Sequence, residues 1–205
     1  MHIQAKEKKE RALGVKLFLK ADRCNSPKCA MVRRPYRPGM HGKSRRRAIS
    51  EYGQQLMEKQ RIRITYGLKE SQMANVFKNA SKKKGSLSEA IIGLLERRLD
   101  NTVFRLGLAP SRIMARQFVS HGHILVNGRK VTVPSFLVKI GDVITVKPTS
   151  LNSLIFKELS NTIKKYQAPE WLIIDAEKIE GKVKSLPVSI EMPFDINLVV
   201  DFYSK

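Results

Sequence analysis

The chain has little of what a secreted or membrane-embedded protein needs. Among 205 residues there are two cysteines and one tryptophan. No apolar run approaches the roughly 18 residues that a membrane span requires, and the charged amino terminus lacks the apolar segment of a signal peptide. Two cysteines without a secretory signal indicate a reducing compartment. These absences argue against a disulfide scaffold and against a membrane protein.

Acidic residues are also scarce, at 18 Asp and Glu against 39 Lys and Arg, which gives a net charge of +21. The imbalance is uneven: residues 1–50 carry 15 basic and 3 acidic side chains, whereas residues 151–205 carry 7 and 8. A field of this sign and size indicates a polyanionic partner. A membrane surface is the weaker candidate, because no basic amphipathic helix with an aromatic apolar face stands alone.

Residues 110–133 predict a compact α–β unit. Ser111 can cap a helix whose apolar side chains recur at about 100° per residue, and Gly122 can end that helix. Asn127 and Gly128, between two short β-branched segments (124–126 and 130–133), are a strong hairpin signal. The unit contains no acidic residue, and its basic side chains suit a phosphate backbone: Arg112, Arg116, His121, His123, Arg129 and Lys130.

Residues 1–49 predict a basic extension rather than a domain, because apolar residues are too sparse there to offset the entropy of ordering. The segment either folds against a partner, which this charge suggests is RNA, or remains a solvated tail. Tyr36, Met40 and the regularly spaced glycines favour a loop moulded on a partner.

The rest of the chain mixes helical and strand patterns. Trp171 could stack on a base, but its apolar neighbours favour a place in the core. The apolar tail, residues 194–203, is expected to dock on a core. We expect helices over residues 50–66, 71–84, 86–106 and 150–165, a hairpin formed by residues 136–140 and 143–147, and strands over residues 171–175 and 178–183.

The sequence shows no catalytic constellation. It has no phosphate-binding glycine loop followed by Lys-Ser/Thr, and its four histidines have no nearby nucleophile or metal cluster. The run Arg98-Leu99-Asp100 is similar to the catalytic aspartate motif of pseudouridine synthases, but no large separate catalytic domain accompanies it. We therefore expect Asp100 to pair with a nearby cation and the protein not to be an enzyme.

Cys24 and Cys29 have a spacing that can belong to a zinc knuckle. A structural zinc site needs four ligands, and no second cysteine pair exists. His2 and His41 are the nearest imidazoles in the sequence. Two reduced, partly packed thiols are the favoured interpretation, and zinc is the alternative.

The segment SRxxARQxVxxGHIxVNGRxV, residues 111–131, resembles the RNA-binding domain named after small-subunit ribosomal protein four. That domain also occurs in a class of pseudouridine synthases, in bacterial tyrosyl-tRNA synthetases and in a heat-shock RNA-binding protein. Further segments resemble the bacterial or organellar ribosomal protein family itself, and they cover nearly the whole chain: residues 22–42, 58–67, 80–85, 94–107 and 201–205.

The resemblance implies an α+β fold. An irregular basic extension (1–49) precedes a mainly helical domain (50–95, completed by 190–205). An inserted RNA-binding α–β domain with a small antiparallel sheet (96–189) lies between the two parts of the helical domain.

The resemblance also implies a function: a structural component of the small ribosomal subunit, with no cofactor and no homo-oligomer. Such a protein binds the 5′ domain of small-subunit rRNA at a helix junction and nucleates assembly. It lies beside small-subunit ribosomal protein five, near the path by which mRNA enters, and influences decoding accuracy. The expected location is the cytoplasmic ribosome, with an organellar ribosome as the alternative.

Two departures from the family pattern matter. Zinc-bearing members carry two cysteine pairs in the extension, but Glu7 and Glu10 stand here where the first pair would fall, so we expect no metal. Asp195-Ile196 replaces the usual Asn-Glu near the tail, which affects any contact between proteins that the missing Glu would make.

The expected RNA-binding residues are cations and polar groups in two regions. The inserted domain supplies Ser111, Arg112, Arg116, Gln117, His121, His123, Asn127, Arg129 and Lys130. The extension and first domain supply Arg33, Arg34, Arg37, His41, Lys43, Arg45, Arg46, Arg47, Lys82, Lys83 and Lys84. The alternatives are an RNA-modifying enzyme that uses Asp100 and a free-standing RNA chaperone.

Overall fold

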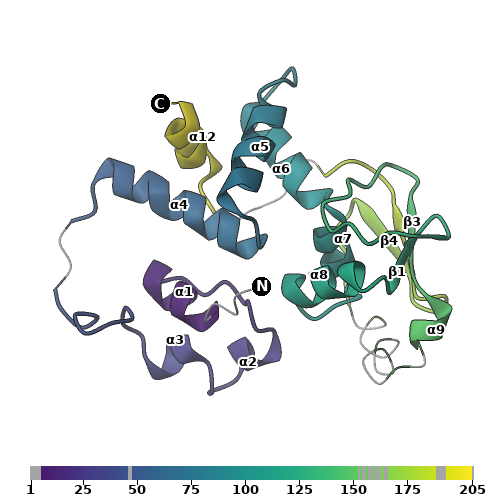
Figure 1. Ribbon diagram of the computed structural model, residues 1–205, viewed down its shortest axis with the longest axis horizontal. Coiled ribbons are helices and arrows are strands. Elements are labelled where there is room, and N and C mark those ends of the chain that lie inside the picture. The colour runs from purple at the N-terminus through teal and green to yellow at the C-terminus, as the bar shows by residue number, and fades with distance from the viewer. Residues whose placement is uncertain are drawn as a thin grey trace. The chain divides into compact units, whose positions relative to one another are not determined.

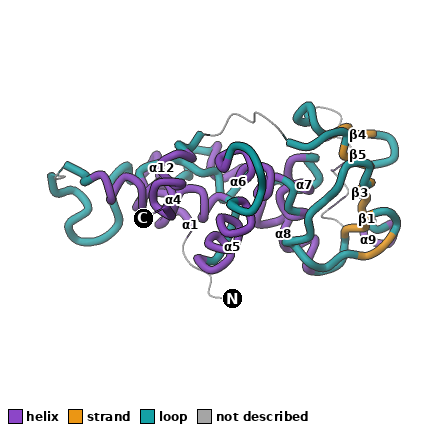
Figure 2. The backbone as a smooth tube through the Cα atoms, turned by 90° about the horizontal axis from the view of Figure 1, so that it is seen from above, coloured by secondary structure: helices purple, strands orange, loops and turns teal. Residues whose placement is uncertain are grey.

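The computed structural model describes residues 6–45, 48–151, 153, 156, 159, 163, 166–187 and 193–204. The chain divides into two compact units (Figure 1). Unit 1 comprises Met1–Ser88 and Glu191–Lys205, and unit 2 comprises Glu89–Ile190. The described strands all belong to unit 2, as the orange segments of Figure 2 show. None of the described helices is long and apolar enough to cross a membrane.

Unit 1 is helical. Ser50 begins α4 as predicted, because its Oγ accepts a hydrogen bond from the Gly53 backbone N–H at 3.2 Å. Its helices are α1 (Lys6–Leu13), α2 (Asp22–Asn25), α3 (Ala30–Arg33), α4 (Glu51–Thr65), α5 (Glu70–Ala80) and α12 (Ile196–Ser204).

The predicted helix over residues 71–84 is too long at its carboxyl end. Helix α5 stops at Ala80, and the Lys83 N–H donates to the Ala80 carbonyl at 2.9 Å in a turn. Gly85 follows with a φ of +108°, a conformation that glycine adopts without strain. Lys82, Lys83 and Lys84 therefore lie in an exposed turn rather than in the last turn of a helix.

The carboxyl-terminal tail docks on unit 1, as predicted. Helix α12 packs against α4, above it in the view of Figure 1. The rings of Phe202 and Tyr52 lie 5.7 Å apart, and those of Tyr203 and Phe77 lie 4.8 Å apart. The Tyr203 hydroxyl donates to Glu70 Oε1 at 3.2 Å. Aromatic stacking with a polar tip thus fastens the last helix.

The extension is more ordered than the irregular segment expected from the sequence. Three short helices form in it, and Leu13, Leu17 and Leu19 are buried. Glu10 is fully buried, and its Oε1 accepts the backbone N–H groups of Leu17 and Leu19 at 3.0 and 3.2 Å. A buried carboxylate oxygen thus satisfies two backbone N–H groups of the loop that follows α1.

The single helix predicted over residues 86–106 is wrong. The structure has α6 (Leu87–Glu96) and α7 (Leu99–Arg105), separated at Arg98, whose ψ of 136° is extended. The segment at 136–138 causes the break, because the Val138 N–H donates to the Arg97 carbonyl at 2.9 Å and the Leu99 N–H to the Phe136 carbonyl at 2.8 Å.

The same pairing overturns the predicted hairpin of residues 136–140 with 143–147. Residues 136–140 form only an isolated bridge, between Leu137 and Arg98. Strand β3 (Val143–Val146) lies between β1 (Ile124–Val126) and β5 (Glu180–Val183) instead.

The sheet of unit 2 has five antiparallel strands in the order β2-β1-β3-β5-β4. Strand β2 is Arg129–Lys130, shorter than predicted, and β4 is Leu172–Asp175. The predicted hairpin turn is confirmed, with positive φ at Asn127 (51°) and Gly128 (76°). A small antiparallel sheet beside helices confirms the expected α+β class.

The apolar core of unit 2 joins α7 and α8 (Arg112–Ser120) to the sheet. Trp171 is 4% exposed and belongs to this core, which confirms the interpretation favoured from its neighbours. Of the helix predicted over residues 150–165, the structure shows α9 (Pro148–Leu151) at its start, and most of the remainder lies outside the described residues.

Candidate nucleic-acid interface

Helix α8 carries two of the predicted arginines one turn apart. Ser111, 5% exposed, caps the helix by accepting the Met114 N–H at 3.3 Å, so its role is to begin α8. Gln117 is exposed, and Arg112 and Arg116 are half-buried.

Both arginines rest on polar groups of α7. Arg112 Nε donates to Asn101 Oδ1 at 2.8 Å, and its guanidinium carbon lies 4.5 Å from the centre of the Phe104 ring. Arg116 Nη1 lies 3.6 Å from Asp100 Oδ2.

Asp100 is 4% exposed and pairs with cations, which confirms the expectation from the sequence. Arg98 donates to both of its carboxylate oxygens, at 3.1 and 2.8 Å. A buried carboxylate held by a bidentate arginine stabilises the local structure.

The corner between α8 and β1 holds the two histidines. His121 is exposed, whereas His123 is half-buried, with Nδ1 2.9 Å from Ser150 Oγ and its ring centre 5.7 Å from that of Phe156. Gly122 follows the helix with a φ of +75°, which suits the end of α8, and a Cβ there would meet the end of the Lys130 side chain.

The Asn127 side chain stabilises the hairpin through two hydrogen bonds. Its Nδ2 donates to Asp142 Oδ1 at 2.8 Å, and its Oδ1 accepts the Val143 N–H at 2.9 Å. Arg129 and Lys130 are exposed on the edge strand β2. We give the name helix–hairpin surface to the predicted side chains that lie on α8, at the corner after it and on β2: Arg112, Arg116, Gln117, His121, His123, Arg129 and Lys130.

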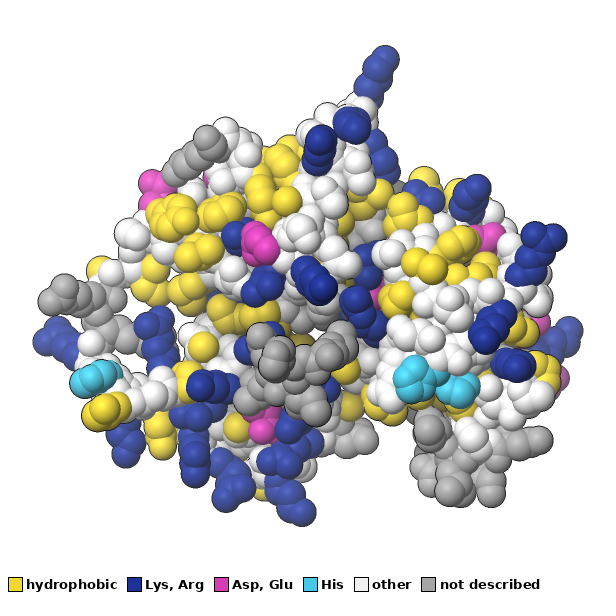
Figure 3. All heavy atoms as spheres, viewed as in Figure 1, with side chains coloured by type: hydrophobic (Ala, Val, Ile, Leu, Met, Phe, Trp, Pro, Cys, Tyr) yellow, Lys and Arg dark blue, Asp and Glu magenta, His cyan; other side chains and the backbone are white. Residues whose placement is uncertain are grey.

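The predicted residues of unit 1 lie in two places. Most of the extension residues are exposed, and Arg37 is half-buried: Arg33, Arg34, Arg37, His41, Lys43 and Arg45. Arg46 and Arg47 lie outside the described residues. The three lysines after α5 form a separate exposed turn. On the face shown in Figure 3, Lys and Arg side chains far outnumber acidic ones.

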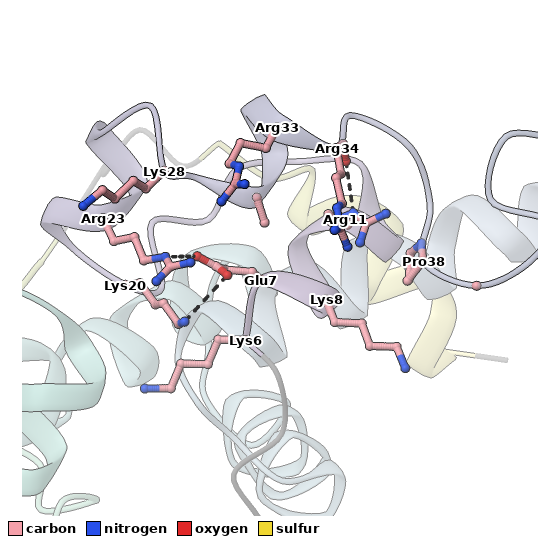
Figure 4. Close-up of a pocket in the computed structure, with 12 residues that line it drawn as sticks. Lys6, Glu7, Lys8, Arg11, Lys20, Arg23, Lys28, Arg33, Arg34 and Pro38 are labelled. Atoms are coloured by element: carbon pink, nitrogen blue, oxygen red, sulfur yellow. Dashed lines mark hydrogen bonds and ion pairs between the residues drawn. The ribbon is translucent and has the colours of Figure 1, made fainter.

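The extension also contains a hollow of about 470 Å³, which we call the extension cleft (Figure 4). Its one acidic lining residue, Glu7, is engaged by Arg23 Nε at 2.8 Å and Lys20 Nζ at 3.6 Å. Arg11 is engaged too, because its Nε donates to the Arg34 and Tyr36 carbonyls at 3.0 Å. The cleft is lined by Lys6, Glu7, Lys8, Arg11, Lys20, Arg23, Lys28, Ala30, Arg33, Arg34, Pro38 and Gly39.

Several cations of the cleft remain uncompensated. Within the described part of the chain, no ion pair to a carboxylate is present for Lys6, Lys8, Lys28 or Arg33. Sequence reasoning missed the lysines. The charge run at residues 6–11 was visible, but only the packing of α1 against α3 places it around the same hollow as Arg33. Uncompensated cations around a hollow suit an anionic ligand such as phosphate.

The described residues of the extension offer no set of ligands for a metal ion. Cys24 and Cys29 are fully buried, and Cys24 Sγ accepts the Lys20 N–H at 3.4 Å. Burial raises the pKa of the Cys24 thiol, and the Glu10 and Glu7 carboxylates raise it further. Glu10 is committed to backbone N–H groups. Among the described residues, no group of three or more His, Cys, Asp or Glu could hold a metal ion.

The fold and the surfaces define a class of protein: an α+β chain with a cation-lined cleft in one unit and a basic helix–hairpin surface in the other, suited to a folded polyanion. Comparisons with known proteins narrow this class. Residues 2–96 match the ribosomal protein S4/S9 N-terminal domain, and residues 97–144 match the S4 domain.

Curated relatives named small ribosomal subunit protein uS4 align over 94% of this chain and 93% of their own length. The identity is 51% to the protein of Caldicellulosiruptor bescii, 49% to that of Thermus thermophilus and 47% to that of Desulfitobacterium hafniense. The chain therefore belongs to the uS4 family of ribosomal proteins. These relatives are named as ribosomal proteins and not as enzymes, in agreement with the expectation from the sequence.

Proposed function

We propose that this chain is a structural, rRNA-binding component of the small ribosomal subunit and that its two cationic surfaces are the contacts to rRNA. The cationic side chains around the extension cleft and on the helix–hairpin surface carry this proposal. Lys and Arg side chains that neutralise phosphates release counterions, so binding depends steeply on salt. The chain then works in the cytoplasmic ribosome.

The proposed target is the 5′ domain of the rRNA at a junction of several helices. The grooves of A-form RNA hide base edges from side chains, so a protein of this kind reads the shape of a folded RNA. Two units that each carry basic residues suit a junction, where several backbones converge. Binding early to such a junction is how the protein nucleates assembly in this proposal.

The proposal also assigns the protein its neighbours in the small subunit. We infer a place near the path of incoming mRNA, beside small-subunit ribosomal protein five, with an influence on decoding accuracy. The resemblance supports these statements. The altered Asp195-Ile196 pair changes one candidate contact: Asp195 Oδ1 accepts the Asn197 N–H at 3.0 Å, and so serves the start of α12.

Binding of the full chain to the 5′ domain of its own small-subunit rRNA tests the proposal. The control is an unrelated folded RNA of equal length, and both affinities are measured across a salt series. We expect a preference for the 5′ domain that persists at physiological salt, because shape complementarity does not depend on counterion release.

Two other outcomes would contradict the proposal. Equal affinity for both RNAs, lost together as salt rises, would leave only nonspecific attraction and favour an RNA chaperone. A chaperone would also be present on isolated subunits at less than one copy per particle.

A further inference from the structure

A buried polar network lies beneath the two arginines of α8. Glu96 is fully buried, and its carboxylate accepts hydrogen bonds from Arg105 Nε and Nη2, both at 3.0 Å, and from Asn101 Nδ2 at 2.9 Å. Asn101 Nδ2 also donates to the Glu96 carbonyl at 3.0 Å. The residue that ends α6 is thus tied to two residues of α7.

These contacts fix the orientation of the Asn101 amide. Asn101 is 1% exposed, and both of its Glu96 partners are oxygens that accept hydrogen bonds. The amide nitrogen must therefore face Glu96, and the amide oxygen must face outward. That oxygen accepts the Nε–H of Arg112 at 2.8 Å. Glu96 thus determines, through Asn101, which acceptor Arg112 meets.

Arg112 is held by a second contact as well. Its guanidinium lies over the ring of Phe104, 4.5 Å from the ring centre. The hydrogen bond at Nε and the ring beneath one face together restrict a side chain that otherwise has many rotamers. The side chain is ordered before any ligand arrives.

We propose that Asn101, oriented by Glu96, is a positioning residue for Arg112 and holds its guanidinium in the orientation in which it meets an RNA phosphate. The inference rests on the proposed function, since it requires Arg112 to contact RNA. Asn101 itself touches no RNA. Preorganisation lowers the cost of ordering a long side chain on binding, which corresponds to about a three- to tenfold gain in affinity.

A double-mutant cycle on the full chain, with rRNA 5′-domain affinity as the readout, tests this inference. We expect Asn101→Ala to weaken binding about three- to tenfold, with an unchanged salt slope because no charge is removed. Arg112→Ala should weaken binding and lower the salt slope by about one. The double variant should bind no more weakly than Arg112→Ala alone, because Asn101 acts through Arg112.

Two further variants separate positioning from stability. Arg112→Lys keeps the charge but lacks the Nε–H and the planar fork, so it should lose about as much affinity as Asn101→Ala, with the same salt slope. Thr102→Ala is the matched control, because Thr102 is fully buried in the same helix and its hydroxyl donates to the Arg98 and Glu96 carbonyl groups, not to Asn101 or Arg112. Its rRNA affinity should equal that of the unaltered chain.

Three results would overturn the inference: wild-type affinity in Arg112→Lys, no loss of affinity in a folded Asn101→Ala variant, or an undiminished further loss when Asn101→Ala is added to Arg112→Ala. If the unaltered chain shows no preference for rRNA, the proposed function fails instead. The two failures are therefore distinguishable.

Discussion

The extension and the α7–α8 region both present arginines and lysines, but they hold them in different ways. In the extension, two charged side chains bind backbone: Arg11 donates to main-chain carbonyl groups, and Glu10 accepts main-chain N–H groups. Glu7 pairs with the side chains of Arg23 and Lys20 at the cleft. In unit 2, side chains bind each other, as in the Arg98–Asp100 and Arg105–Glu96 pairs.

The difference follows from the size of the apolar core. Unit 2 buries aromatic and branched side chains from two helices and the sheet, so burial stabilises its backbone and polar groups can orient arginines. The extension buries a few leucines and two cysteines, so its polar groups must stabilise the fold itself. We therefore expect the substitution of a buried acidic residue to lower the stability of the region that contains it and to leave the other region unchanged.

The largest expected effect is that of Asp100→Ala. It leaves Arg98, 5% exposed, as a buried charge without its bidentate partner, which costs about 3–5 kcal/mol. Denaturant unfolding followed by the fluorescence of Trp171, the single tryptophan, measures this loss. The exposed Glu177→Ala is the control and should stay within about 0.5 kcal/mol. A loss below about 1 kcal/mol in Asp100→Ala would contradict the role given to the pair.

Glu10→Ala should destabilise the extension by about 2–4 kcal/mol, because the buried N–H groups of Leu17 and Leu19 lose their acceptor. Hydrogen exchange at these two amides should accelerate, while the unfolding transition reported by Trp171 stays in place. Glu7→Ala, which removes ion pairs to partly exposed cations, should cost less than about 1 kcal/mol. If Glu10→Ala destabilised the transition reported by Trp171 as much as it destabilises the extension, the extension and unit 2 would not be independent.

Gly181→Ala should destabilise unit 2 by about 1–3 kcal/mol through overpacking, because a Cβ on this strand would collide with the Leu106 side chain. Gly93→Ala in α6 is the matched change. A Cβ there meets nothing closer than the Pro187 carbonyl oxygen at 4.0 Å, so helix propensity should make it neutral or stabilising by up to about 1 kcal/mol. Thermal unfolding of both variants checks the pair, and equal shifts would refute the packing argument.

The smallest effect concerns the docked tail. Burial, then the neighbouring Glu70 carboxylate, raises the pKa of Tyr203 above its ordinary value of 10.0. Because the pKa is raised in the folded state, the protonated Tyr203 hydroxyl contributes fully to the stability of the docked helix below pH 10. This stabilisation is lost as the pH rises further. Proteolytic cleavage near α12 should therefore increase above about pH 10. Tyr203→Phe should stabilise the docked helix by about 1 kcal/mol less, and its cleavage should no longer depend on pH in this range. An unchanged pH profile in that variant would assign the pH dependence to another group.

Local signals in the sequence were sufficient for part of the fold. Ser50 and Ser111 cap their helices, and Asn127-Gly128 forms the hairpin turn, because each is determined by neighbouring backbone. The break at Arg98 was not predictable, since it depends on hydrogen bonds to residues 136–138, distant in the sequence. Tertiary pairing there overrides a continuous helical pattern.

The candidate site also has one part that could be predicted from the sequence and one part that could not. The basic residues of α8 and the hairpin could be identified from composition and order. The extension cleft could not, because its lysines come from segments that only the packing of α1 against α3 brings together. Asn101 was missed for a similar reason: an asparagine within a helical pattern gives no sign that Glu96 orients it toward Arg112.

The salt dependence of rRNA binding tests the central claim, that both cationic surfaces contact RNA. Three double variants of the full chain would be compared: Lys28→Ala/Arg33→Ala in the cleft, Arg129→Ala/Lys130→Ala in the hairpin, and Lys178→Ala/Lys182→Ala as an exposed control outside both surfaces. We expect a salt slope lower by about two for the first two variants and an unchanged slope for the control. Equal reductions in all three would mean that only the overall charge attracts RNA, and would contradict a role for the two surfaces.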